Sequence, residues 1–149
     1  MQTCVTRDQI VRAARSWAGT PYHHQASAKG IGADCLGLVR GVWRDCFGSD
    51  CEVPPTYSRD WAEASGVETM LAGAAAHLVP VGVARIKPGD VIVFRLRQGY
   101  VAKHAGIVTS ENTMIHAMEG GPASEVAVSP WWRRRIAAAF QFPHLKDGE

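Results

Sequence analysis

The chain has 149 residues, 46% of them hydrophobic and 20% charged, and its formal net charge is +2 at neutral pH. This composition is typical of a folded protein with one sizeable core, and it argues against an intrinsically disordered chain and against a strongly basic protein that binds nucleic acid. The length predicts a single domain over residues 1–149.

Hydropathy and cysteine content indicate the cellular compartment in which we expect the chain. Residues 1–20 lack the apolar stretch of a signal peptide, and no later segment approaches the roughly 20 apolar residues that cross a bilayer. We therefore expect a soluble chain with no signal peptide and no membrane insertion. Without a signal peptide, Cys4, Cys46 and Cys51 are expected to be reduced, small core residues of a cytoplasmic chain, although a local disulfide between Cys46 and Cys51 stays open.

The first part of the chain predicts three helices. A capping-box pattern at Thr6 and Gln9 begins the first helix, which ends before Gly19. A loop follows, and apolar residues at helical spacing predict a second helix over 35–47. A third helix is expected over residues 67–78.

After these helices the pattern changes to short strands. Each runs for four to seven residues and is separated from the next by turn-forming residues, over 91–96, 104–109, 113–118, 125–128 and 136–142. Helices first and strands afterwards predict an α+β fold, in which the helices pack on an antiparallel sheet of about five strands.

Cys35 lies where a glycine-bearing loop runs into the second predicted helix, directly after Asp34, a good helix cap. The sulfur of Cys35 is then expected near unpaired backbone amides and the positive end of the helix dipole, which favour the thiolate. Cysteine has no capping advantage, so this position indicates a nucleophile rather than a core residue.

His104 and His116 fall inside two predicted strands that flank a hairpin turn, twelve residues apart. With an odd-length loop, this even separation places both imidazoles on the same face of the sheet as neighbours. We expect the pair to face the second helix and to act as base and orienter for Cys35. Two alternatives remain open: a purely structural histidine pair, and a zinc site formed by Cys35, His104 and His116.

Five motifs in this order resemble the NlpC family of papain-like cysteine peptidases. They are Gly19-Thr20-Pro21-Tyr22, Asp34-Cys35-Leu36-Gly37-Leu38-Val39, Pro88-Gly89-Asp90-Val91, His104-Ala105-Gly106-Ile107-Val108 and Ile115-His116-Ala117. The resemblance covers most of the chain and implies a papain-like NlpC fold.

The resemblance also implies the roles of the site residues. Cys35 would attack the peptide carbonyl, His104 would accept its proton, and His116 would orient His104. Tyr22 and Asp34 would line the substrate site, and the amide of Cys35 would stabilise the oxyanion. The implied enzyme needs no metal and no cofactor. Its implied substrate is the peptidoglycan stem peptide, cut between a D-glutamyl residue and a diamino acid.

Two departures from the family pattern concern the substrate. Leu36 stands where the family usually has serine, and the segment 48–87 is longer than the minimal family core, so it could cover the cleft or bind a partner.

The run Trp131-Trp132-Arg133-Arg134-Arg135 makes the chain most similar to the cell-wall peptidases of phage tails and gene transfer agents. This resemblance implies assembly in the cytoplasm and delivery in a phage-like tail or baseplate, with tail proteins as partners. Core packing and a solvated charged face are the plainer interpretations of the tryptophans and the arginines. Two other functions stay open: a catalytically silent component of a tail tip, and an amidase or acyl transferase that uses the same cysteine and histidine.

Overall fold

A computed structural model of the chain describes residues 5–49, 69–97, 99 and 101–146. Its helices are α1 (Arg7–Arg15), α2 (Cys35–Phe47), α4 (Thr69–His77) and the short α5 (Pro130–Arg133), with a 3₁₀ turn η1 (Val83–Arg85). Among the described residues, no helix combines the length and the apolar character needed to cross a membrane.

The strands form a six-stranded sheet in the order β3-β8-β4-β5-β6-β7, and every pairing in it is antiparallel. Its members are β3 (Val79–Val81), β4 (Val91–Phe94), β5 (His104–Ser110), β6 (Thr113–His116), β7 (Ser124–Ala127) and β8 (Ile136–Gln141). The predicted α+β class is confirmed, and the count of about five strands is corrected to six. The strand absent from the prediction is β3, an edge strand with Pro80 at its centre, which hides the alternating pattern.

The helix boundaries follow the predicted signals. Thr6 and Gln9 form the capping box of α1, and Asp34 caps α2 by accepting a hydrogen bond from the Gly37 amide. At the other end of α2, Gly48 takes the left-handed conformation, with φ of 83°. The loop before α2 is more ordered than expected, because it contains the two-stranded pair β1 (Ser27–Ala28) and β2 (Gly32–Ala33).

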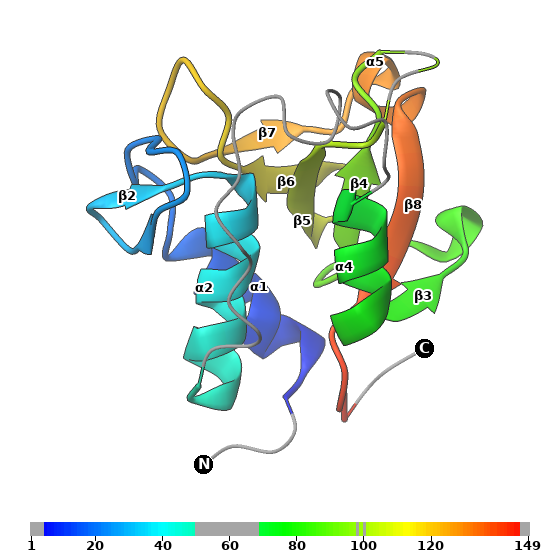
Figure 1. Cartoon of the computed structure of the whole chain (residues 1–149). Helices are drawn as coiled ribbons and strands as arrows, with labels where there is room; N and C mark the ends of the chain where they lie inside the picture. Colours follow the sequence, from blue (N-terminus) through cyan, green and yellow to red (C-terminus); the bar gives the residue numbers. More distant parts are fainter. Residues whose placement is uncertain (1–4, 50–68, 98, 100, 147–149) are drawn as a thin grey trace.

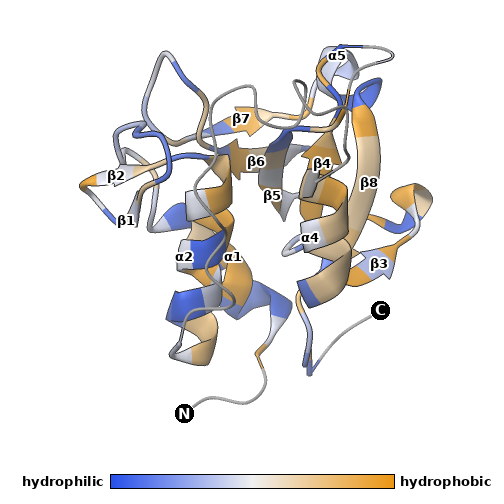
Figure 2. Ribbon diagram, viewed as in Figure 1, coloured by the Kyte–Doolittle hydropathy of each residue, from blue (hydrophilic) through white to orange (hydrophobic). Residues whose placement is uncertain are grey.

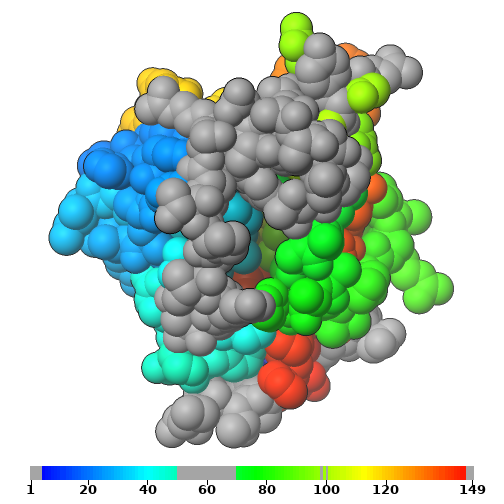
Figure 3. All heavy atoms as spheres, viewed as in Figure 1, coloured from blue at the N-terminus to red at the C-terminus, as the bar shows by residue number. Residues whose placement is uncertain are grey.

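Helices α1, α2 and α4 lie on one side of the sheet, with α1 and α2 against β5 and α4 against β8 (Figure 1). The atoms of α2 and α4 share the face of the molecule seen in the space-filling view (Figure 3). The predicted packing of the helices on the sheet is therefore confirmed.

The two faces of the sheet carry separate apolar clusters. The helix-side cluster includes Val91, Val93, Ala105, Ile107 and Ile115 together with residues of α1, α2 and α4. The opposite face carries a smaller cluster, formed by Ile92, Phe94, Val108, Met114 and Val128, with Trp132 packed against it. Strand β4 contributes to both clusters, so it is buried and hydrophobic along its whole length (Figure 2).

Two glycines in α2 allow its neighbours to approach closely. A Cβ atom on Gly37 would lie 1.8 Å from the backbone oxygen of Ala26, and one on Gly41 would lie 2.0 Å from the Trp17 ring. Neither position has room for a larger residue without a shift of the loop or of α1. These contacts fix the start of α2, and with it Cys35, against the preceding loop.

A buried ion pair joins α1 to the start of β4. Asp90 is fully buried, and its Oδ1 atom lies 2.7 Å from Nη1 of Arg7, whose side chain is 12% exposed. Its other carboxylate oxygen accepts a hydrogen bond from the Lys87 amide. Burial raises the pKa of Asp90, and this effect outweighs the opposite effect of Arg7. The Pro-Gly-Asp motif is thus an anchor between a helix and the sheet.

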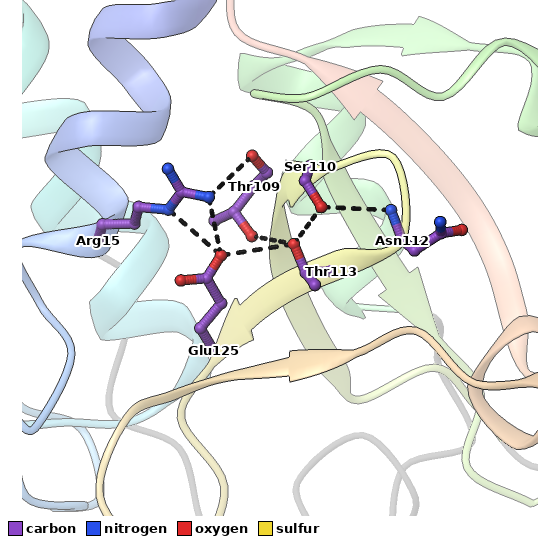
Figure 4. Close-up of polar contacts among 6 residues, drawn as sticks. All are labelled: Arg15, Thr109, Ser110, Asn112, Thr113 and Glu125. Carbon is purple, nitrogen blue, oxygen red and sulfur yellow. Dashed lines mark hydrogen bonds and ion pairs between the residues drawn. The ribbon is translucent and has the colours of Figure 1, made fainter.

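A second polar cluster connects α1 to the far edge of the sheet (Figure 4). Arg15 forms an ion pair with Glu125 of β7, with a separation of 3.0 Å. Thr113 of β6 lies within hydrogen-bonding distance of both Glu125 and Thr109. Because Thr109 is the extra residue of a bulge in the pairing of β5 with β6, this cluster stabilises the bulged hairpin and the edge strand together.

Candidate active site

Cys35 and His104 line one cavity of about 260 Å³, located where α2 begins and β5 starts. Tyr22 and Asp34, both predicted from the sequence, also line it. Apolar side chains contribute the rest of one wall, namely Leu36, Met70 and Leu96. The cavity therefore brings together four of the five predicted site residues, and the fifth, His116, contacts His104.

The sulfur of Cys35 lies against the beginning of β5. The backbone amides of Ala105, Leu36 and Cys35 itself lie near enough to the sulfur to lower the pKa of its thiol, and the residue as a whole is half-buried. Ala105 directly follows His104, so the nucleophile candidate and the base candidate are held next to each other by backbone contacts.

The expected thiolate is not what this environment favours. Burial and, to a smaller extent, the Asp34 carboxylate raise the pKa of the Cys35 thiol to about 12. The three backbone amides lower this pKa, but by less than burial and Asp34 raise it. The amides at the helix start are present as predicted. Burial, which depends on segments far away in the sequence, outweighs them.

The two histidines form the predicted pair. Nε2 of His104 lies 2.9 Å from Nδ1 of His116, and both residues are buried. The observed register pairs Ile107 with Ile115, which puts positions 104 and 116 on the same face as diagonal neighbours. The expected placement on one face is therefore confirmed, but the turn between Ser110 and Thr113 has two residues rather than an odd number, and the bulge at Thr109 supplies the extra residue.

The direction of the pair differs from the prediction. Side chains alternate along β5, and since Ala105 and Ile107 face the helices, His104 points to the opposite face with its strand partner Phe94. His104 reaches the cavity beside α2 because it is the first residue of β5, at the end of the strand. The expectation that both rings face the second helix was wrong for this reason.

Burial also keeps the imidazoles neutral. It lowers the pKa of His104 to about 3, with a smaller contribution from His116, and it lowers the pKa of His116 as well. Together with the raised pKa of Cys35, these shifts mean that the resting site at neutral pH holds a thiol and two neutral rings.

Comparison with known proteins identifies the family. Residues 19–140, most of the chain, match the model of the NlpC/P60 family. The chain belongs to the NlpC/P60 family. Its predicted resemblance is thereby confirmed at the family level.

Two curated relatives of this NlpC/P60 chain are similar in sequence. It is 29% identical over 103 residues to the probable endopeptidase NlpC of Escherichia coli (strain K12), covering 69% of this chain and 56% of that protein. It is 26% identical over 137 residues to the gamma-DL-glutamyl hydrolase of Bacillus subtilis (strain 168), covering 91% of this chain and 29% of that protein. The chain thus spans less than two thirds of the length of either relative.

Solved structures show the same fold. The NlpC/p60 domain of the peptidoglycan hydrolase SagA superposes with a TM-score of 0.68 at 21% identity, over 93% of this chain and all of that one. An NlpC/P60 family protein from Bacillus cereus gives a TM-score of 0.69 at 18% identity, over 93% of this chain and 41% of that one.

Asp34 and Tyr22, the two residues predicted to line the substrate site, differ in their contacts with the rest of the protein. The Asp34 carboxylate accepts hydrogen bonds from the backbone amides of Gly37 at 2.8 Å and Gln25 at 2.7 Å, and it is 3% exposed. It therefore shapes the loop and the helix start of this NlpC/P60 domain. Tyr22 is half-buried and forms an isolated bridge with Ala33. Both residues line the cavity, and their contact with substrate stays a prediction.

Several residues of the cavity region were missing from the prediction. Met70 of α4 and the two charged residues Lys103 and Glu119 line the cavity, and Trp132 of α5 packs on both histidines. Met70 belongs to the segment 48–87, so part of this addition to the NlpC/P60 core borders the site; residues 50–68 lie outside the described part of the chain. Met70, Lys103 and Glu119 belong to no motif. Trp132 belongs to the Trp-Arg run, for which core packing was one interpretation, but its contact with the histidines arises from tertiary packing.

Cys46 is a buried, free thiol in the helix-side cluster, as predicted, whereas Cys4 and Cys51 lie outside the described residues. Within the described ranges, no group of three or more His, Cys, Asp or Glu side chains is arranged to hold a metal ion.

The neutral state of His104 predicts how stability depends on pH. Its pKa falls from 6.5 in the unfolded chain to about 3 in the fold, so the unfolded chain binds the extra proton first. This contribution to stability is complete above pH 6.5 and is lost as the pH falls toward 3. Urea unfolding at several pH values should show it as roughly 1 kcal/mol lost per pH unit.

The matched comparison for this pH dependence is His104→Asn, which cannot titrate. Subtracting its unfolding free energies from those of the wild type cancels the carboxyl groups, including Asp90, whose raised pKa acts in the opposite direction. Parallel curves for the two proteins between pH 6.5 and 4 would show that His104 is not buried in its neutral form.

Proposed function

We propose that this chain is a cysteine endopeptidase that hydrolyses peptide bonds in the stem peptides of peptidoglycan, at the bond between a D-glutamyl residue and a diamino acid. The observation that carries the proposal is the cavity lined by both Cys35, at the start of a helix, and His104, whose ring is hydrogen-bonded to His116. The names of the relatives, an endopeptidase and a gamma-glutamyl hydrolase, support the same reaction class.

The geometry assigns a proton route for the first step. Because Nε2 of His104 faces His116, Nδ1 is the ring nitrogen left to accept the proton of Cys35. We infer that His104 carries its own proton on Nε2 and donates it to Nδ1 of His116, which fixes the tautomer and the ring orientation. His116 thus acts on the nucleophile only through His104.

Proton transfer and attack then follow the logic of a nucleophile and its base. As the Sγ proton passes to Nδ1 of His104, the sulfur bonds to the carbonyl carbon and the carbonyl oxygen becomes negative. We infer that the backbone amide of Cys35, at the helix start, stabilises this oxyanion. The imidazolium returns the proton to the leaving amine, and water, activated by His104, hydrolyses the thioester and restores the free thiol.

The neutral resting state of Cys35 and His104 affects when charge forms in this mechanism. With the thiol protonated and the imidazole neutral, charge separation occurs only when the carbonyl is in place to receive the sulfur. The amides of Ala105, Leu36 and Cys35 lower the pKa of the thiol, so they favour the negative charge that develops on the sulfur as its proton leaves.

Digestion of purified sacculi tests the proposal. The protein is incubated with sacculi, and the released fragments are identified by mass spectrometry. Fragments cut between the D-glutamyl residue and the diamino acid support it. Cleavage between glycan and peptide would instead identify an amidase, transfer of the acyl group to an added amine would identify a transferase, and intact sacculi would favour a catalytically silent protein.

We further propose that a phage-like tail carries the enzyme to the cell wall after assembly in the cytoplasm. The support is the resemblance in the C-terminal Trp-Arg run, in which Trp131 is 44% exposed and the neighbouring Arg133 and Arg134 are also exposed. Purified tail particles that contain the chain in a fixed copy number would support this role, and particles that lack it would contradict it.

A further inference from the structure

Trp132 contacts both rings of the histidine pair. Its indole stacks on His104, with ring centroids 5.6 Å apart and an interplanar angle of 28°, and it meets His116 edge-on at 5.2 Å and 85°. On a third side it packs against Phe94 at 4.8 Å. One side chain thus touches the base candidate, its orienter and the aromatic residue that pairs with His104 across the sheet.

Short α5 holds Trp132 between two strands that lie next to the strands of His116 and Phe94. Helix α5 joins β7, which pairs with β6 and so lies next to His116, to β8, which pairs with β4 and so lies next to Phe94. Its C-terminal end is fixed by Arg135, which donates hydrogen bonds to the Trp131 and Leu96 carbonyls, and the Arg135 carbonyl accepts one from the Arg95 amide. The polar cluster at the other end of β7 anchors the same segment (Figure 4).

A stacked indole restricts an imidazole in two ways. It blocks rotation of the His104 ring about its last torsion, and it excludes water from the hydrogen bond between the two rings. His104 is only 4% exposed and His116 only 8%, although the cavity beside them is open. The half-buried Trp132 is therefore part of the cover that separates the pair from solvent.

We propose that Trp132 is a positioning residue, whose indole holds the His104 ring so that Nε2 faces His116, which leaves Nδ1 as the nitrogen that would serve Cys35. The kinetic consequences of this proposal rest on the proposed function. Its claim that Trp132 fixes the orientation of the His104 ring against His116 does not depend on activity. The neighbouring Trp131 lacks these contacts: its ring lies under the Arg135 guanidinium, 3.6 Å from the centroid, and touches Trp132 edge-on.

The ionisable groups around His104 come from several elements. They are His116 on β6, Asp34 and Cys35 at the start of α2, and Lys103, Glu119 and His24, which line the same cavity. Substitutions at Trp132 and Trp131 leave all of these groups unchanged.

Three variants test the proposal: Trp132→Leu, which removes the stacked ring, Trp132→Phe, which keeps a smaller one, and Trp131→Ala as the matched control. We expect Trp132→Leu to lower kcat by about tenfold or more with KM within about twofold, and Trp132→Phe to restore most of the loss. The acid limb of the pH profile should move up by roughly one pH unit in Trp132→Leu, because water reaches the imidazole. Trp131→Ala should match the wild type in all three readouts.

A second measurement does not depend on substrate. In the wild type, the proton shared by His104 and His116 should give a slowly exchanging imidazole N–H signal in NMR spectra, and this signal should be lost in Trp132→Leu and weakened in Trp132→Phe. If both variants keep the wild-type signal and pH profile, or if Trp131→Ala changes them equally, the proposal is overturned. Since the NMR readout needs no turnover, a protein that leaves sacculi intact would refute the enzymatic function without deciding the role of Trp132.

Discussion

Replacing Cys35 with alanine is expected to reduce the digestion of purified sacculi by roughly 10⁴-fold or more, because the sulfur is the only protein atom in the proposed mechanism that bonds to the carbonyl carbon. The initial rate of fragment release, followed by liquid chromatography, measures the effect. The substitution removes a half-buried side chain at the end of a helix, so the free energy of unfolding should change by no more than about 1 kcal/mol.

Cys46→Ala is the matched control for this variant. Cys46 lies in the same helix, is 5% exposed and packs in the helix-side cluster, away from the cavity lining. Its removal should cost some stability and leave the rate of digestion within about twofold of the wild type. Equal digestion by the Cys35→Ala protein and the wild type would end the proposal that Cys35 is the nucleophile.

Replacing Asp90 with alanine should produce the largest loss of stability. The Arg7 guanidinium would remain almost buried without its counter-charge, and the Lys87 amide would lose its acceptor. Breaking a buried pair in this way costs about 3–5 kcal/mol, a large share of the stability of a typical domain. Urea unfolding at neutral pH, followed by tryptophan fluorescence, measures the change.

Asp8→Ala, on the helix that also carries Arg7, provides the comparison for Asp90→Ala. Asp8 pairs with Arg12 at 3.0 Å, but both side chains are exposed, at 75% and 70%. An exposed pair of this kind contributes less than about 1 kcal/mol. Similar losses of unfolding free energy in the two variants would mean that burial does not increase the contribution of the Arg7–Asp90 pair to stability.

Local signals in the sequence predicted the parts of the fold that depend on neighbouring residues. The capping box at Thr6, the cap at Asp34 and the left-handed stop at Gly48 each act within four residues, so the pattern carries them directly. The pairing of His104 with His116 was accessible for a similar reason, because both residues belong to one hairpin.

Features that depend on distant segments were not accessible in this way. Strand β3 forms because β8 offers it an edge, and its own residues, exposed and interrupted by Pro80, carry no alternation. The raised pKa of Cys35 depends on burial of the thiol by the assembled fold, and the contact of Trp132 with the histidines requires α5 to bridge β7 and β8. A helix of four residues has no periodicity from which it could be recognised.

The hairpin of β5 and β6 supplies both imidazoles, whereas the sulfur arrives on a separate helix that meets β5 through the Ala105 amide. The proposed base and its orienter are thus preassembled as one local unit, and the packing of α2 against β5 sets their alignment with the proposed nucleophile. Warming that loosens α2 from the sheet should therefore abolish the proposed activity while the strands are still paired. On heating, activity would then be lost at a lower temperature than the β-structure.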